Sequence, residues 1–120
     1  MVEFTIVLMP LLLLLFAIIE FGLVMYDKVT VVHDAREAAR LASVDDLAGK
    51  KLLADAPAGS SVTFTCTPAT GADVGDTITA HVTYVHAFVT PLIGDLFGGT
   101  INLSSNATLM LEAKPTGYCP

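Results

Sequence analysis

The hydrophobic and polar positions of the chain divide it into one long apolar run and a following region of shorter, alternating patterns. Residues 4–19 contain no charged side chain, and Glu3 and Glu20 stand at the two ends of this stretch. The apolar character continues to Tyr26, and residues 4–26 correspond to about 35 Å of α-helix, enough to cross the hydrocarbon core of a bilayer. A chain of 120 residues has no interior deep enough to bury such a helix, so lipid or other copies of the helix must cover it.

The same helix is expected to continue through residues 27–43 with an amphipathic pattern. Glu20, Asp27 and Asp34 lie seven residues apart on one face. A different face carries a seam of apolar or small residues with a spacing of about 3.5 residues, made by Phe21, Met25, Val29, Val32, Ala35, Ala39 and Ala42. Alanine is a strong helix former and lets another backbone approach closely. The pattern predicts one helix over residues 1–43.

A short second helix is expected at about residues 46–54, at the start of a small globular head that spans residues 44–120. Ser43 followed by Asp46 resembles a capping box with aspartate in place of glutamate. Gly49 weakens this helix by roughly 1 kcal/mol relative to alanine.

The rest of the head is predicted to be an antiparallel sheet, because its polar and apolar residues alternate with a period of two. The alternating runs predict strands at about 61–66, 77–88 and 100–112. The segment between the last two strands is expected to be a loop with room for one apolar turn. The fold class is therefore α+β, with a long helix, a short helix and a three-stranded meander that has one face on the long helix and one in water.

The two cysteines, Cys66 and Cys119, are expected to meet at one edge of this meander. The first strand ends at Cys66 where the second begins, and the third strand ends beside that same point. A bond there closes a loop of about 54 residues and contributes roughly 4 kcal/mol in the chain-entropy model. The alternative is two unpaired thiols; two cysteines without CxxC spacing are poor metal ligands.

Composition and charge exclude several classes of function. Charged residues make up 15% of the chain, well below the roughly 25% of a soluble domain. The net charge is −6 and the few basic residues are scattered, which argues against nucleic-acid binding and against a polybasic membrane patch. His33, His81 and His86 fall on different elements or opposite strand faces, and no catalytic motif appears. Neither enzymatic activity nor a cofactor is expected.

The N-terminal run does not read as a cleavable secretory signal. No lysine or arginine precedes Lys28, and no A-x-A site follows the run, which is longer than a signal-peptide core. The missing basic region suggests that a short basic leader lay upstream of Met1.

Four motifs follow one another over residues 2–42, which are Val2-Glu3-Phe4, an apolar run with Pro10, Ile19-Glu20-Phe21-Gly22 and Ala35-Arg36-Glu37-Ala38-Ala39-Arg40. Their order resembles the TadE-like pilins of the tight-adherence (Tad) pilus, and the resemblance is strongest over these residues. The later strands are similar too, with Tyr84 before Pro91-Leu92 and Leu109-Met110-Leu111-Glu112 closing the sheet.

This resemblance implies a type IV pilin-like subunit. Such a subunit is exported with a basic leader, cut by a prepilin peptidase, held in the membrane and polymerised into a homo-oligomeric filament by inner-membrane assembly machinery. In the family a glutamate stands at the fifth position after the cut, whereas Glu3 is third here. The difference favours residues missing upstream or a different cut; a true start at Met1 is the alternative.

The resemblance and elementary electrostatics together select candidate assembly residues, which are Glu3, Phe4, Pro10, Glu20 and Lys28. A carboxylate at the tip of an apolar helix is costly in hydrocarbon unless it is paired. Glu3 is therefore expected either to pair with the N-terminal ammonium of a neighbouring subunit, which sets the axial register, or to be a solvated flank. Glu20 has the same two interpretations.

Two other positions in the helix have two interpretations each, and two asparagines in the head are candidate sites of glycosylation. Pro10 is either a tolerated transmembrane proline or a point where the helix stretches during packing. Lys28 either snorkels at the membrane edge or pairs with Glu20 of a neighbour. Asn102 and Asn106 fit the glycosylation sequon on the outward face of the third strand.

The preferred hypothesis is a structural subunit of an extracellular Tad-type pilus that serves adhesion or surface attachment. The subunit would be anchored in the bilayer by its helix before assembly, and would end at the cell surface in the filament. One alternative is a minor pseudopilin of the assembly machinery. The other is a monomeric, membrane-anchored surface domain that binds a partner through its loops.

Overall fold

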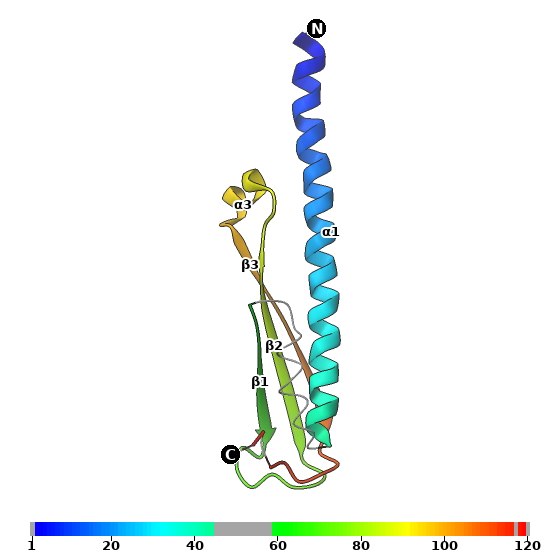
Figure 1. The fold of residues 1–120 in the computed structure, drawn as a ribbon, viewed down its shortest axis with the longest axis vertical. Coiled ribbons are helices and arrows are strands. Elements are labelled where there is room, and N and C mark those ends of the chain that lie inside the picture. Colours follow the sequence, from blue (N-terminus) through cyan, green and yellow to red (C-terminus); the bar gives the residue numbers. More distant parts are fainter. Residues whose placement is uncertain (1, 45–58, 117, 120) are drawn as a thin grey trace.

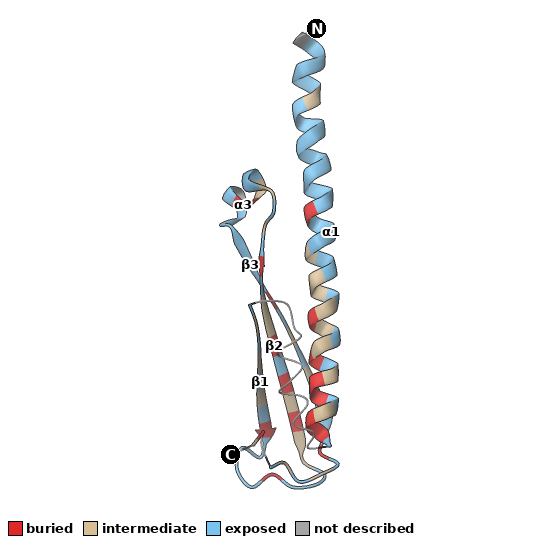
Figure 2. Ribbon diagram, viewed as in Figure 1, coloured by how far each residue is buried: buried red, intermediate tan, exposed pale blue. Residues whose placement is uncertain are grey.

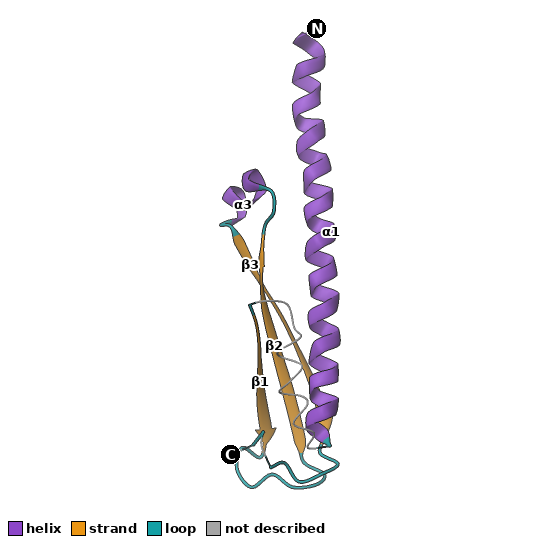
Figure 3. Ribbon diagram, viewed as in Figure 1, coloured by secondary structure: helices purple, strands orange, loops and turns teal. Residues whose placement is uncertain are grey.

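The computed structural model describes residues 2–44, 59–116, 118 and 119. It consists of α1 (Val2–Ser43), β1 (Ser60–Thr67), β2 (Thr77–Ala87), α3 (Pro91–Phe97) and β3 (Thr100–Met110) (Figure 1). The molecule is elongated, with extents of 72 × 22 × 18 Å, because the sheet lies along only the C-terminal part of α1. The predicted α+β class is confirmed (Figure 3). The short helix predicted at about 46–54 lies outside the described residues.

The three strands form one antiparallel sheet in the order β1-β2-β3, which is the predicted meander. Thr77 of β2 pairs with Thr67 of β1 on one side and with Met110 of β3 on the other. The even-numbered residues of β2 face α1, and Ile78, Ala80 and Val82 are completely buried. The opposite face is open to solvent and carries threonine pairs such as Thr79 and Thr108.

The helix packs on the sheet through small side chains, which lets the two backbones come close. Ala35, Ala39 and Ala42 are completely buried and Ala38 nearly so. Ala38 and Ala39 form one cluster with Ala80 of β2. Figure 2 shows the buried positions gathered along the lower part of α1 and along β2, while the upper part of α1 is exposed.

The predicted seam faces the sheet only at its C-terminal end. Phe21, Met25 and Val29 are 64%, 45% and 69% exposed, whereas the buried stripe instead begins at Glu20 and continues through Val31. The reason is geometric, because Phe21, Met25 and Val29 follow one another every four residues, and each step of four places the next side chain about 40° further around the helix. The seam therefore turns away from the sheet between Phe21 and Val29, and it faces the sheet again from Ala35 onward.

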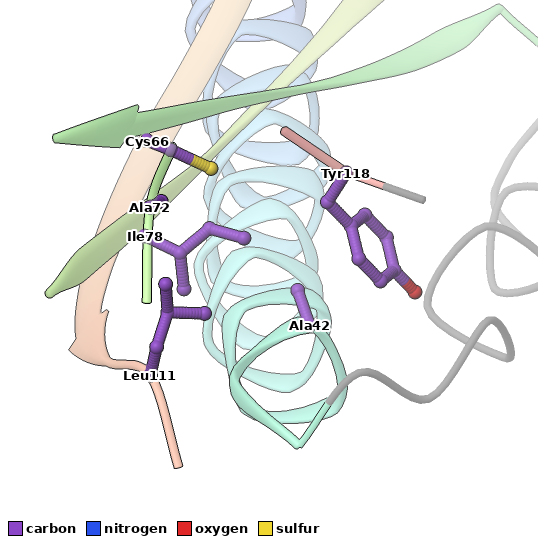
Figure 4. Close-up of a cluster of buried hydrophobic side chains, with 6 residues drawn as sticks. All are labelled: Ala42, Cys66, Ala72, Ile78, Leu111 and Tyr118. Atoms are coloured by element: carbon purple, nitrogen blue, oxygen red, sulfur yellow. The ribbon is translucent and has the colours of Figure 1, made fainter. Parts of the chain in front are cut away.

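The far end of the head is closed by the segment that follows β3. The carbonyl of Ser43 at the end of α1 accepts hydrogen bonds from the backbone N–H groups of Glu112 (2.8 Å) and Ala113 (3.1 Å). A buried cluster of Ala42, Cys66, Ala72, Ile78, Leu111 and Tyr118 fills this end (Figure 4). The ring of Tyr118 meets Phe64 edge-on, with 4.6 Å between centroids. The predicted disulfide between Cys66 and Cys119 is present.

Candidate functional site

The N-terminal part of α1, up to Ile19, is largely left uncovered by the rest of the described chain, and its tip extends beyond the head (Figures 1 and 2). From Glu3 to Ile19 every residue is exposed except the partly buried Leu8. Among the described residues, α1 is the one helix whose length and composition would allow it to cross a membrane. Pro10 lies within this helix without ending it.

Where the head first meets α1, the carboxylate of Glu20 is buried against the turn between β2 and α3. The Glu20 side chain is only 3% exposed. Its Oε1 accepts a hydrogen bond from the backbone N–H of Val89 (2.7 Å), and its Oε2 accepts one from the hydroxyl of Thr90 (2.7 Å). The head itself therefore supplies donors to this carboxylate.

His86 lies between Glu20 and a second acidic residue of the same helix face. Its Nδ1 is 2.5 Å from Oδ2 of Asp27, and its Nε2 is 3.8 Å from Oε1 of Glu20. Nε2 is buried and makes no hydrogen bond within the described residues. Since Glu20 and Asp27 are two helical turns apart, one imidazole at the end of β2 reaches both carboxylates.

The α3 turn is held in place by its own backbone and by aromatic contacts. Thr90 precedes α3 and uses its hydroxyl on Glu20, so it makes no side-chain cap for α3. Gly98 ends the helix at φ 81°, in the left-handed region that favours glycine. The ring of Phe88 contacts both His86 (5.6 Å between centroids) and Phe97 (6.0 Å).

Between α1 and this turn lies an apolar groove of about 370 Å³. Its lining residues come from α1, β2–α3 and β3, and are Ala17, Glu20, Phe21, Val24, Phe88, Ile93, Phe97 and Ile101. A larger hollow of about 770 Å³ lies at the other end of α1, beside Arg36, Arg40 and the end of β3. Within the described part of the chain, no group of three or more His, Cys, Asp or Glu side chains could hold a metal ion.

A family model described as TadE-like protein matches residues 1–40. The N-terminal third of this chain is TadE-like. The match agrees with the resemblance seen in the sequence over nearly the same residues. It covers nearly all of α1 and stops before the head. No curated protein and no solved structure matches the chain significantly.

The structure separates the candidate residues of the TadE-like helix into two groups. Glu3, Phe4 and Pro10 are exposed on the part that projects beyond the head. Glu20 and Lys28 are engaged with the head, since the Lys28 ammonium donates to the backbone carbonyl of Ser104 on β3. Their roles between subunits stay predictions.

Two further candidates lie on the surface of the head. Asn102 and Asn106 are exposed on β3, on the face away from α1. Their glycosylation stays a prediction. On α1, an ion pair joins Arg40 and Glu37 (2.7 Å), and the hydrogen bond from Arg40 lowers the pKa of Glu37.

Sequence reasoning missed the pairing of His86 with Glu20 and Asp27. The signal was present in the parity of β2, because His86 has the same parity as the buried Ile78 and Val82. A strand residue of that parity must face α1. The sequence did not indicate which residues of α1 lie opposite the end of β2, so the partners of His86 could not be predicted.

Proposed function

We propose that this chain is a structural subunit of an extracellular Tad-type pilus filament, with α1 in the filament core and the strand-rich head outside. The observation that supports this most is the projecting, uncovered apolar half of a TadE-like helix. Two environments can cover such an exposed apolar helix, which are a lipid bilayer and a bundle of identical helices.

The exposed apolar side chains of α1 give the energetic reason why this helix must be covered by lipid or by other helices. Between Phe4 and Ile19, twelve large apolar side chains have exposed fractions of 39% to 72%. Covering them contributes on the order of 10 kcal/mol or more relative to water. Helix packing in a water-free core therefore needs no cofactor to hold subunits together.

In this proposal the subunit is first anchored in the inner membrane, where a prepilin peptidase and the assembly machinery act on it. The apolar helix and the TadE-like match are consistent with membrane anchoring. Glu3, at the exposed tip of α1, pairs with the N-terminal ammonium of a neighbouring subunit during assembly and sets the axial register. Such a pair removes the cost of leaving either charge alone in an apolar core.

The pilus role is tested by shearing cells and pelleting the released material. Fibres that contain this chain are the expected result. Recovery of the chain solely as detergent-soluble monomers would refute the filament and favour a membrane-anchored binding domain.

The register role is tested separately with Glu3→Ala. The variant is expected to insert into membranes normally and to lose polymerisation. Glu37→Ala is the matched control, because it removes another glutamate of α1 that is half-buried beside the head, and it should leave fibre yield unchanged. Normal fibres from Glu3→Ala would contradict the register role.

A further inference from the structure

The turn that contains α3 lies at a height on α1 that belongs to the apolar run. We name residues 88–101 the α3 tip. It lies across the apolar groove from residues 17–24 of α1, at the upper end of the sheet (Figure 1). The head therefore reaches up beside the part of α1 whose composition suits hydrocarbon.

The depth of this contact follows from helix geometry. With Glu3 at one boundary of a bilayer, about 30 Å of hydrocarbon accommodates about 20 helical residues, so the other boundary falls near Leu23. Val24 lies at that boundary and Ala17 about 9 Å inside it. The α3 tip therefore occupies the outermost layer of the hydrocarbon, a depth of about 5–10 Å where amphipathic elements bury their apolar faces.

The outward surface of the α3 tip suits this depth. Val89 and Leu92 are 74% and 61% exposed, and Phe97, which also lines the groove towards α1, is 66% exposed. Asp95 is the single charged residue between Phe88 and Ile101, and it is exposed. Apolar side chains at the end of a head with one carboxylate among them match a membrane–water boundary, where headgroups and water solvate the charge.

The hydrogen bonds of Glu20 also support this depth of the α3 tip. Glu20 lies about 4–5 Å inside the boundary, where a carboxylate requires donors. Its donors come from Val89 and Thr90 of the α3 tip, so the tip has to be at the depth of Glu20 to satisfy it. A tip held in water beyond the headgroups would leave this carboxylate in hydrocarbon without those two partners.

We propose that the α3 tip inserts into the interfacial layer of a phospholipid bilayer while the subunit is membrane-anchored, with Val89, Leu92 and Phe97 facing lipid and the turn docked on Glu20. The head is then a second point of membrane contact beside α1. This inference rests on the membrane-anchored stage of the proposed function, and its test separates the failure of one from that of the other.

The test uses single tryptophan reporters, because the chain contains no tryptophan. The full chain is reconstituted in phosphatidylcholine vesicles whose lipids carry bromine either near the headgroups or near the tail ends. Leu92→Trp reports the tip. Val74→Trp is the matched control, since Val74 is also 61% exposed but lies in the loop between β1 and β2 at the opposite end of the head. Leu13→Trp reports the middle of α1.

Leu92→Trp is expected to lose more of its fluorescence to bromine near the headgroups than to bromine at the tail ends, because the tip lies close to the headgroup boundary. Val74→Trp should be quenched by neither lipid, and Leu13→Trp mainly by bromine at the tail ends. Phe97→Trp gives a second tip reporter in case Leu92→Trp perturbs α3. An intact disulfide on a non-reducing gel shows that each head has folded.

The results that overturn the inference are distinct. If Leu13→Trp is deeply quenched while both tip reporters behave like Val74→Trp, the tip stays in water and the inference fails, with the membrane stage intact. If Leu13→Trp is not quenched, the membrane stage fails as well. If the tip reporters escape quenching and their emission shifts to the blue as the protein-to-lipid ratio rises, a second copy covers the tip in place of lipid.

Discussion

Removing the disulfide between Cys66 and Cys119 should unfold the head at a much lower temperature. The two cysteines are 53 residues apart in sequence. In the chain-entropy model, opening a loop of this length costs about 4 kcal/mol of stability by freeing the unfolded chain. The total stability of a small domain is about 5–15 kcal/mol, so this single bond accounts for a large share of it.

The structure adds a local reason for the size of the effect. Cys66 belongs to the buried cluster that closes the far end of the head, together with Leu111 and Tyr118. The segment after β3 reaches that cluster through Tyr118, whose ring meets Phe64, and through the disulfide itself. Without the bond, a few side chains must hold the C-terminal segment on the sheet.

The measurement is thermal proteolysis of the full chain in detergent micelles, which follows the head while α1 stays in the micelle. For a domain of this size, 4 kcal/mol corresponds to a fall in melting temperature of about 15–30 °C. The double variant Cys66→Ser/Cys119→Ser and the wild-type chain kept in reductant should both show it. A reduced wild-type head that melts within about 5 °C of the oxidised one would refute the loop-closure argument. A fall confined to the serine variant would trace the effect to buried hydroxyls instead.

Two further substitutions test how the head is held on α1. Glu20→Ala removes the two carboxylate oxygens that accept hydrogen bonds from the turn after β2, so hydrogen exchange at the Val89 amide should become at least about tenfold faster. Glu37→Ala removes an exposed ion pair and should leave that rate unchanged. Equal exchange rates in both variants would contradict the role of Glu20. Ala39→Leu overpacks a completely buried position and should destabilise the head by about 1–3 kcal/mol in the same proteolysis assay. Val29→Leu is the exposed control on the same helix, and a loss as large as that of Ala39→Leu would show that helix–sheet contact is not the cause.

Much of the fold followed from periodicity, because the relevant forces act on neighbouring positions. Alternation along three segments predicted the sheet, and the geometry of a meander brought Cys66 and Cys119 to one edge. The α3 helix was expected only as a turn. Its seven residues, Pro91–Phe97, are too few for a helical period to appear, although a proline at its start and a glycine after its end are the usual signals of helix boundaries.

The surroundings of Glu20 could not be predicted in the same way. Its partners Val89 and Thr90 lie 69 and 70 residues away in the sequence. One of the two donors is a backbone N–H, which every residue except proline carries and which therefore leaves no mark in the sequence. The sequence analysis considered Glu20 as a solvated residue or as a partner of a neighbouring subunit. It did not consider that the head of the same subunit binds this carboxylate.

The seam that does not face the sheet has a place in the proposed filament. The head occupies the face of α1 that runs from Glu20 to Ser43 and leaves Phe21, Met25 and Val29 exposed beside it. They are spaced four residues apart, and rows of side chains with this spacing form the ridges through which helices pack against one another. A neighbouring helix that follows this seam can meet α1 from its apolar half down to Val29 without displacing the head. A neighbour on the face of Glu20 would first have to open the two hydrogen bonds that hold the α3 tip.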